Sequence, residues 1–155
     1  MTINKTTNLT RYFLGKGIKK TGRAFCFLYH DGKNKIELNN EAIEVKEIFG
    51  TDENINCLQL VKNLNLVVEK FQLKISDFSF KIRASGGGFE SQKVSIIYSV
   101  AHSLLAFLLE NNAEDKDNIK YFFRQLHFVT VDNRIKERKK IGKTKARKSK
   151  PYVKR

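Results

Sequence analysis

The sequence predicts an α+β protein with a compact head and an extended basic C-terminal tail. Residues 78–84 alternate between apolar and polar side chains, the period-two pattern of a strand with one buried face. Residues 92–110 place apolar side chains at helical spacing. Residues 134–155 hold 12 of the 30 Lys and Arg but only one of the 16 acidic residues. We therefore divide the chain into an N-terminal extension (1–14), an α/β head (15–132) and a tail (133–155).

The head is expected to begin with a β-hairpin. The apolar run 24–29 meets residues 35–38 across Asp31-Gly32-Lys33-Asn34, a four-residue turn with Asp and Gly. A basic strip with interleaved glycines stands just before this first strand and suits phosphate binding, although a solvated loop explains it as well. Its cations are Lys16, Lys19, Lys20 and Arg23.

Helices are expected to follow the hairpin. Asn40 can cap a short helix that ends near Gly50. Apolar residues between 55 and 71 predict one or two helices, with a break at 63–65.

The second half of the head is predicted to contain a strand and two helices. The strand at 78–84 leads to a long buried helix over 92–110, with Ser91 as its N-cap. A polar break at 111–118 then precedes a shorter helix that carries Tyr121 to Leu126.

Three consecutive glycines, Gly86, Gly87 and Gly88, stand between the predicted strand and the long helix. Backbone N–H groups and the helix dipole converge at such a place, so an RNA phosphate could bind there. A tight strand-to-helix turn would need the same residues. The two interpretations are compatible, and the sequence does not choose between them.

The net charge of +14 indicates a polyanionic partner, either nucleic acid or an anionic membrane surface. No stretch approaches the roughly 18 apolar residues of a membrane span, so we expect no membrane partner. Gly142 and Pro151 also argue against one continuous basic helix on a membrane. Nucleic acid is therefore the predicted partner.

No catalytic or metal-binding pattern is present in the sequence. His30, His102 and His127 are scattered, and His102 is interpreted as a satisfied core or interface residue. Cys26 and Cys57 predict two buried free thiols in a reducing compartment. We expect no cofactor, no metal and no enzymatic activity.

These segments together resemble the universal small-subunit ribosomal protein nine family in its bacterial or organellar form. The triplet Gly86-Gly87-Gly88 followed by Gln92 matches the family's GGG-x-x-x-Q stretch. The tail match is the most specific, and it consists of Phe128-Val129-Thr130, Asp132, Arg134, Glu137-Arg138-Lys139-Lys140, Gly142, Lys145-Ala146-Arg147, Pro151 and Lys154-Arg155. The family's long helix usually carries Arg-His where Ile97 and Tyr98 stand here. Compared with the family, the middle segment around Asn54 is longer and is interpreted as a surface extension.

The resemblance implies a two-layer α/β sandwich head of the ribosomal-protein, left-handed βαβ type. It also implies binding to small-subunit rRNA in the subunit head beside neighbouring head proteins, and a tail end, Lys154 and Arg155, that reaches peptidyl-site tRNA. The remaining residues expected to bind RNA are the four cations of the basic strip, Lys81, Arg83, Gly86, Gly87, Gly88, Gln92, Arg134, Arg138, Lys139, Lys140, Lys143, Lys145, Arg147, Lys148 and Lys150.

Two other functions stay open from the sequence. One is a free-standing, non-specific RNA-binding protein or RNA chaperone, and the other is a small enzyme that uses the glycine loop for a nucleotide. Abundant Asn, Lys, Ile and Phe with a single Pro indicate an AT-rich genome. This composition favours the ribosome of a plastid or mitochondrion, with the cytoplasm of an AT-rich bacterium as the alternative.

Overall fold

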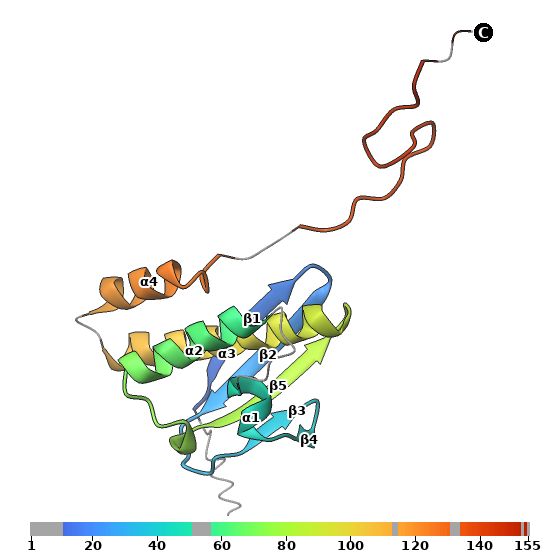
Figure 1. Cartoon of the computed structure of the whole chain (residues 1–155). Helices are drawn as coiled ribbons and strands as arrows, with labels where there is room; N and C mark the ends of the chain where they lie inside the picture. The colour runs from blue at the N-terminus through green and yellow to red at the C-terminus, as the bar shows by residue number, and fades with distance from the viewer. Residues whose placement is uncertain (1–10, 51–56, 113–114, 131–133, 153, 155) are drawn as a thin grey trace, which may run out of the picture.

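The computed structural model describes residues 11–50, 57–112, 115–130, 134–152 and 154. The predicted α+β class is confirmed by a five-stranded sheet and a set of helices (Figure 1). In chain order the elements are β1 (Phe13–Lys19), β2 (Gly22–Tyr29), β3 (Ile36–Leu38), β4 (Glu41–Ala42), α1 (Val45–Phe49), α2 (Leu58–Lys70), a 3₁₀ helix (Ile75–Asp77), β5 (Ser79–Ser85), α3 (Phe89–Asn111) and α4 (Lys116–Gln125).

The sheet has the strand order β1-β2-β5-β3-β4, and only β3 and β5 pair in parallel. The predicted hairpin between residues 24–29 and 35–38 is wrong, because β5 lies between these two strands. Instead, β2 forms a hairpin with β1, and Lys20 turns the chain with a φ of 54°. The basic strip therefore lies in the first strand and its turn.

The loop after β2 is held by the segment that leads into β5. The Gly32 N–H donates to the Asp77 carbonyl oxygen at 3.0 Å, and the Ser79 hydroxyl donates to Asp31 at 2.6 Å. These two bonds run from the loop toward β5. They explain why an Asp-Gly turn does not close a hairpin here.

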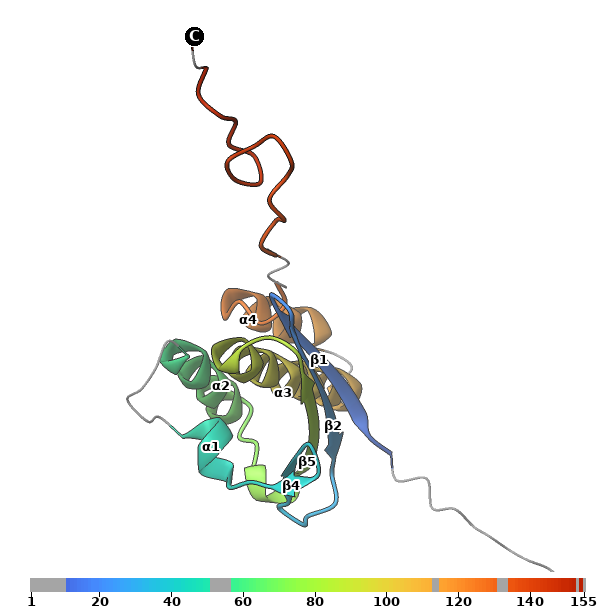
Figure 2. The same cartoon turned by 90° about the vertical axis from the view of Figure 1, so that its right-hand side faces the viewer.

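All helices of the described residues lie on one face of the sheet (Figure 2). The longest, α3, crosses β1 and β2 and buries Val100, Ala101 and Leu104. By length and composition α3 is apolar enough to cross a membrane, contrary to the expectation from the sequence. In this fold it packs along the sheet, which accounts for its apolar character.

Glycines and serines bring α3 unusually close to β1. A Cβ atom on Gly17 would lie 1.9 Å from the Ser95 carbonyl oxygen, and one on Gly15 would lie 1.9 Å from that of Ser99. The facing serines recur every fourth residue, and the hydroxyls of Ser95, Ser99 and Ser103 donate to carbonyl oxygens of α3 itself. The glycines of the basic strip thus provide close packing between helix and sheet.

Two predicted helix starts are wrong. Asn40 does not cap a helix, because it lies in the β3–β4 turn with a φ of 73°. The helix α1 begins only after Glu44, although it ends before Gly50 as predicted. Ser91 lies inside α3, whose N-cap is Gly88. The Ser91 hydroxyl bonds a neighbouring strand, so it serves tertiary packing and does not cap the helix.

The break predicted at 63–65 is also wrong, because α2 is continuous. Asn63 is buried and donates from Nδ2 to the Leu126 carbonyl oxygen at 3.3 Å. Asn65 donates to the Phe49 carbonyl oxygen at 3.2 Å. These asparagines join α2 to its neighbours, so the helix tolerates them. The segment around Asn54 lies outside the described residues.

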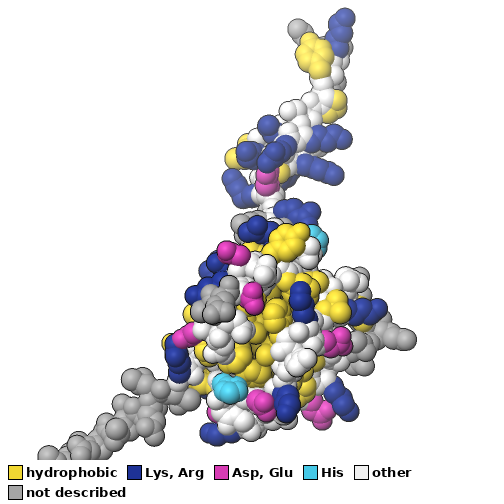
Figure 3. Space-filling view, turned by 90° about the vertical axis from the view of Figure 1, so that its left-hand side faces the viewer, with side chains coloured by type: hydrophobic (Ala, Val, Ile, Leu, Met, Phe, Trp, Pro, Cys, Tyr) yellow, Lys and Arg dark blue, Asp and Glu magenta, His cyan; other side chains and the backbone are white. Residues whose placement is uncertain are grey.

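The core lies between the sheet and the helices. Hydrophobic side chains gather in the middle of the face shown in Figure 3, where one end of this layer reaches the surface. The Phe107 ring contacts those of Phe78 and Phe13 at centroid distances of 5.0 and 5.3 Å. Cys26 and Cys57 are both buried free thiols, as predicted. Burial raises the pKa of Cys26 to about 12, which keeps that thiol neutral.

Candidate nucleic-acid interface

The fold brings together the β1–β2 turn and the glycine triplet, which are more than 60 residues apart in the sequence. The Ser91 hydroxyl donates a hydrogen bond to the Lys19 carbonyl oxygen. A Cβ atom on Gly86 would lie 2.7 Å from the Thr21 carbonyl oxygen. One on Gly87 would lie 2.9 Å from the Gly22 nitrogen. The two predicted clusters therefore form one surface, which we call the cradle: residues 19–23 and 86–88.

Two glycines of the cradle also need left-handed backbone. Gly86 and Gly87 have φ values of 70° and 71°, a region that side chains disfavour. A Cβ on Gly88, in contrast, would meet open space. The tight-turn interpretation thus explains the first two glycines, and the third leaves the helix terminus open to solvent.

The N-terminus of α3 carries features of an anion site. Gly88 offers no side chain to cap the first-turn N–H groups, and the positive end of the helix dipole lies there. Gln92 donates from Nε2 to the Gly86 carbonyl oxygen at 3.1 Å, which fixes the loop. The acid of the first turn, Glu90, accepts a long contact from the Cys57 thiol at 3.9 Å.

The cations of the head differ in their surroundings. Lys16, Lys20, Arg23 and Arg83 are exposed. Lys81 is half-buried and lies 3.6 Å from Glu37 Oε2, while Lys35 lies 2.6 Å from Glu37 Oε1. The hydrogen bond from Lys35, followed by its charge, lowers the pKa of Glu37.

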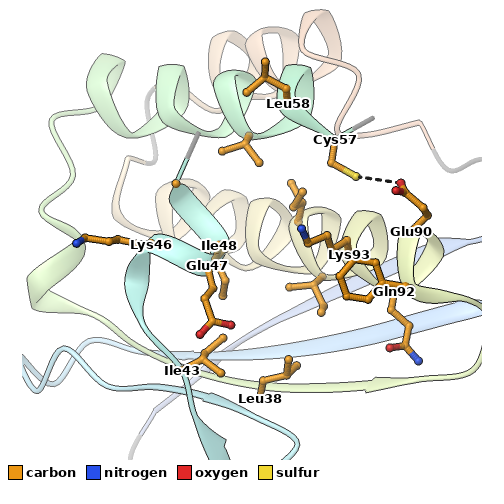
Figure 4. Close-up of a pocket in the computed structure, with 15 residues that line it drawn as sticks. Leu38, Ile43, Lys46, Glu47, Ile48, Cys57, Leu58, Glu90, Gln92 and Lys93 are labelled. Carbon is orange, nitrogen blue, oxygen red and sulfur yellow. Dashed lines mark hydrogen bonds between the residues drawn. The ribbon is translucent and has the colours of Figure 1, made fainter. Parts of the chain in front are cut away.

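A pocket that the sequence did not predict lies between α1, α2 and the start of α3 (Figure 4). Its volume is about 370 Å³, and apolar side chains such as Leu38 and Ile48 line it. Lys46, Glu47 and Lys93 contribute charges of both signs at its wall. Mixed charge does not suit a polyanion, so we keep this pocket separate from the cradle.

His102 links α3 to β1 and to the segment that leads to the tail. Its Nδ1 lies 2.6 Å from the Lys16 carbonyl oxygen, and its Nε2 lies 2.8 Å from that of Phe128. Tyr98 packs edge-on against the Phe128 ring, and Ile97 is buried in the core. His102 is therefore an interface residue, as predicted, and positions 97 and 98 are used for packing.

Residues 134–152 extend away from the helices and strands (Figure 1). Glu137 accepts two hydrogen bonds from Arg147 Nε, at 2.9 and 3.1 Å, and one from its Nη2. The hydrogen bond with Arg147 lowers the pKa of Glu137. Arg147 is thus already paired with the one acid among these residues. The remaining predicted cations of the tail are exposed or half-buried, namely Arg134, Arg138, Lys139, Lys140, Lys143, Lys145, Lys148, Lys150 and Lys154; Arg155 lies outside the described residues.

Comparison with known proteins identifies the family. The family model "Ribosomal protein S9/S16" matches residues 17–155. The chain belongs to the ribosomal protein S9 family. The small ribosomal subunit protein uS9 of Chlorobium phaeovibrioides is 30% identical over 139 residues, which cover 90% of this chain and 94% of that protein.

The S9 family match includes both the cradle and the whole tail. The chain is therefore a constituent of the small ribosomal subunit and is located in the ribosome. The family is structural and non-enzymatic, so the enzyme alternative is excluded. Among the described residues, no group of three metal-ligating side chains comes together.

Proposed function

We propose that this protein binds small-subunit rRNA in the subunit head, beside neighbouring head proteins, and that its tail reaches peptidyl-site tRNA. The observation that carries the rRNA part is the cradle. It joins the basic β1–β2 turn to an α3 N-terminus that has no side-chain cap. Such a terminus accepts a phosphate, and the adjacent cations supply complementary charge.

The tail adds a second and longer contact. Extended at about 3.3 Å per residue, a segment of this length reaches on the order of 70 Å, enough to cross between RNA segments. Phosphate contacts from its Lys and Arg would position the RNA without reading its sequence. Helices on one sheet face are consistent with the two-layer, left-handed βαβ type that the resemblance implies.

The tRNA part concerns the last two residues. Pro151 has a fixed φ, which stiffens the backbone that leads to these residues. Tyr152 is 94% exposed and could stack on a base. The Arg155 side chain is a planar fork that suits phosphate oxygens. We infer that Lys154 and Arg155 hold the tRNA backbone.

We assign the ribosome to a plastid or mitochondrion, with an AT-rich bacterium as the alternative. The amino-acid composition, which indicates an AT-rich genome, supports this assignment. Locating the gene in an organellar, nuclear or bacterial genome distinguishes these sources.

A salt titration tests the rRNA part of the proposal. The rRNA of the subunit head is the 3′ major domain of small-subunit rRNA. We expect the affinity of the protein for this domain to fall steeply with salt, with a log–log slope of several units for about 6 to 10 phosphates. Lys20→Asn, which suits the left-handed backbone, should reduce the slope by about one. Lys62→Gln on the exposed side of α2 is the control. A flat titration would contradict the proposal.

A further inference from the structure

The sheet face opposite the helices carries a second surface, which we call the open face. Alternation along β1, β2 and β5 directs every second side chain to it. Strand pairing aligns two rows across the three strands: Lys16, Phe25 and Arg83 in one, and Leu14, Phe27 and Lys81 in the other. No helix of the described residues covers this face (Figure 2).

The centre of the open face is apolar and accessible. Leu14 is 51% exposed and Phe25 is 37% exposed, although both lie in a regular sheet. Tyr12, at the edge of the face, is 52% exposed and contacts the Phe27 ring at 5.5 Å. Large apolar side chains gathered on one surface mark a site where a partner binds.

Positive charge borders this apolar centre. Lys16 and Arg83 flank Phe25 on the two neighbouring strands. Neither side chain forms an ion pair within the described residues. The Arg83 guanidinium lies 5.9 Å from the Phe27 ring. The acid on this side of β3, Glu37, is already paired with Lys35 and Lys81.

An exposed ring between two cations fits a nucleotide. A base stacks on an aromatic face, and the cations hold the phosphates beside it. Adjacent strands are about 4.8 Å apart, so Lys16 and Arg83 can reach phosphates on both sides of one base. The face also continues into the cradle, because Arg23 pairs with Ser85 directly before Gly86.

We propose that the open face binds unpaired RNA, with one base stacked on Phe25 and its flanking phosphates held by Lys16 and Arg83. This inference rests on the proposed rRNA binding and narrows it to single-stranded nucleotides at a defined surface. A duplex would not offer an accessible base to the ring, since its bases are stacked on each other.

The chain contains no Trp, so Phe25→Trp in the full protein gives a single reporter at the proposed stacking position. We expect its emission to be quenched when decaadenylate is added to several equivalents beyond saturation, so that the basic tail cannot sequester all the RNA. A matched ten-base-pair RNA duplex should leave the emission unchanged. Tyr121→Trp is the control, because Tyr121 is 61% exposed on α4.

Affinity for the 3′ major domain RNA provides an independent readout. Phe25→Leu should weaken binding by about 5- to 150-fold, since one stacked base contributes roughly 1 to 3 kcal/mol. Its salt slope should equal that of the unaltered protein because no cation is removed. Phe25→Tyr should bind normally, and Tyr121→Leu is the matched control. Thermal unfolding verifies that each variant is folded.

The outcomes separate this proposal from the one it rests on. Unquenched Phe25→Trp emission in saturated complexes, or normal affinity of folded Phe25→Leu, would overturn stacking while leaving rRNA binding intact. Failure of the unaltered protein to bind the 3′ major domain RNA would contradict the proposed function itself. An emission change caused by purified subunit-head proteins but not by RNA would make the open face a protein interface and the proposal wrong.

Discussion

The cradle and the tail carry cations in different ways. In the cradle, Gly86 and Gly87 have left-handed backbone, and β1 is held against α3 by close packing. In the tail, the described residues lie outside helices and strands, and Glu137 with Arg147 forms a local bidentate pair. A folded surface therefore fixes where a few phosphates can bind, whereas an extended segment supplies charge over a long distance.

Removing the tail should separate the rRNA affinity of the folded head from that of the tail. A chain that ends at Asp132 keeps Phe128, which is fully buried, and thus should keep a cooperative thermal transition. Its rRNA affinity should fall by roughly 100-fold or more, because 12 Lys and Arg are lost. Calorimetry and RNA titration measure the two properties. Loss of the thermal transition would show that the tail belongs to the core.

The close packing under the cradle should be intolerant of a single methyl group. Gly17→Ala places a Cβ 1.9 Å from the Ser95 carbonyl oxygen, a backbone atom that cannot move freely. We expect a loss of about 3 kcal/mol in the free energy of unfolding, measured by urea denaturation. Gly88→Ala is the matched control, since its Cβ would meet open space. Equal stability of the two variants would refute the packing argument.

The tail end should act on tRNA and not on assembly. Deleting Lys154 and Arg155 removes a charged fork while leaving the rest of the tail. Peptidyl-site tRNA binding to purified subunits should weaken by about 1 to 3 kcal/mol, the scale of a charged hydrogen bond. Normal subunit yield on a sucrose gradient is the control. Unchanged tRNA affinity would mean that the end only packs against RNA.

Cys26 should make the head less stable in alkali. Its pKa is about 12 in the folded state against an ordinary value of 9.0, so above pH 9 only the unfolded chain readily releases this proton. Stability is therefore retained below pH 9 and lost as the pH rises toward 12, by about 1 kcal/mol between pH 9 and 10. Urea denaturation at both pH values measures it. The Cys26→Ala variant should lack this pH-dependent loss of stability, and the Cys57→Ala variant should retain it. Identical pH dependence of stability in the two variants would contradict the attribution to Cys26.

Local sequence patterns were sufficient to predict several strands and helices. The alternation around Phe80 and Ile82 predicted β5, and helical spacing predicted α3 and α4 to within a few residues. Each of these signals comes from side chains close together in the chain. The glycine triplet and the basic strip were likewise identified by residue type alone, without any knowledge that they touch.

Tertiary structure decided the rest. β1 was not predicted because Gly15 and Gly17 weaken any local strand signal. These glycines are needed because the serines of α3 pack directly against them. The four-residue spacing of Ser91, Ser95, Ser99 and Ser103 was the signal that could have revealed this packing.

Residue type and spacing were enough to predict the α+β class, the positions of β5 and the long helix, the charge of the tail and the motifs of the S9 family. Only the tertiary structure placed β5 between β2 and β3, joined the β1–β2 turn to Gly86 and Gly87, and left Phe25 exposed between Lys16 and Arg83. The physical reason is that periodicity and charge are local properties, whereas strand pairing depends on contacts between residues far apart in the chain.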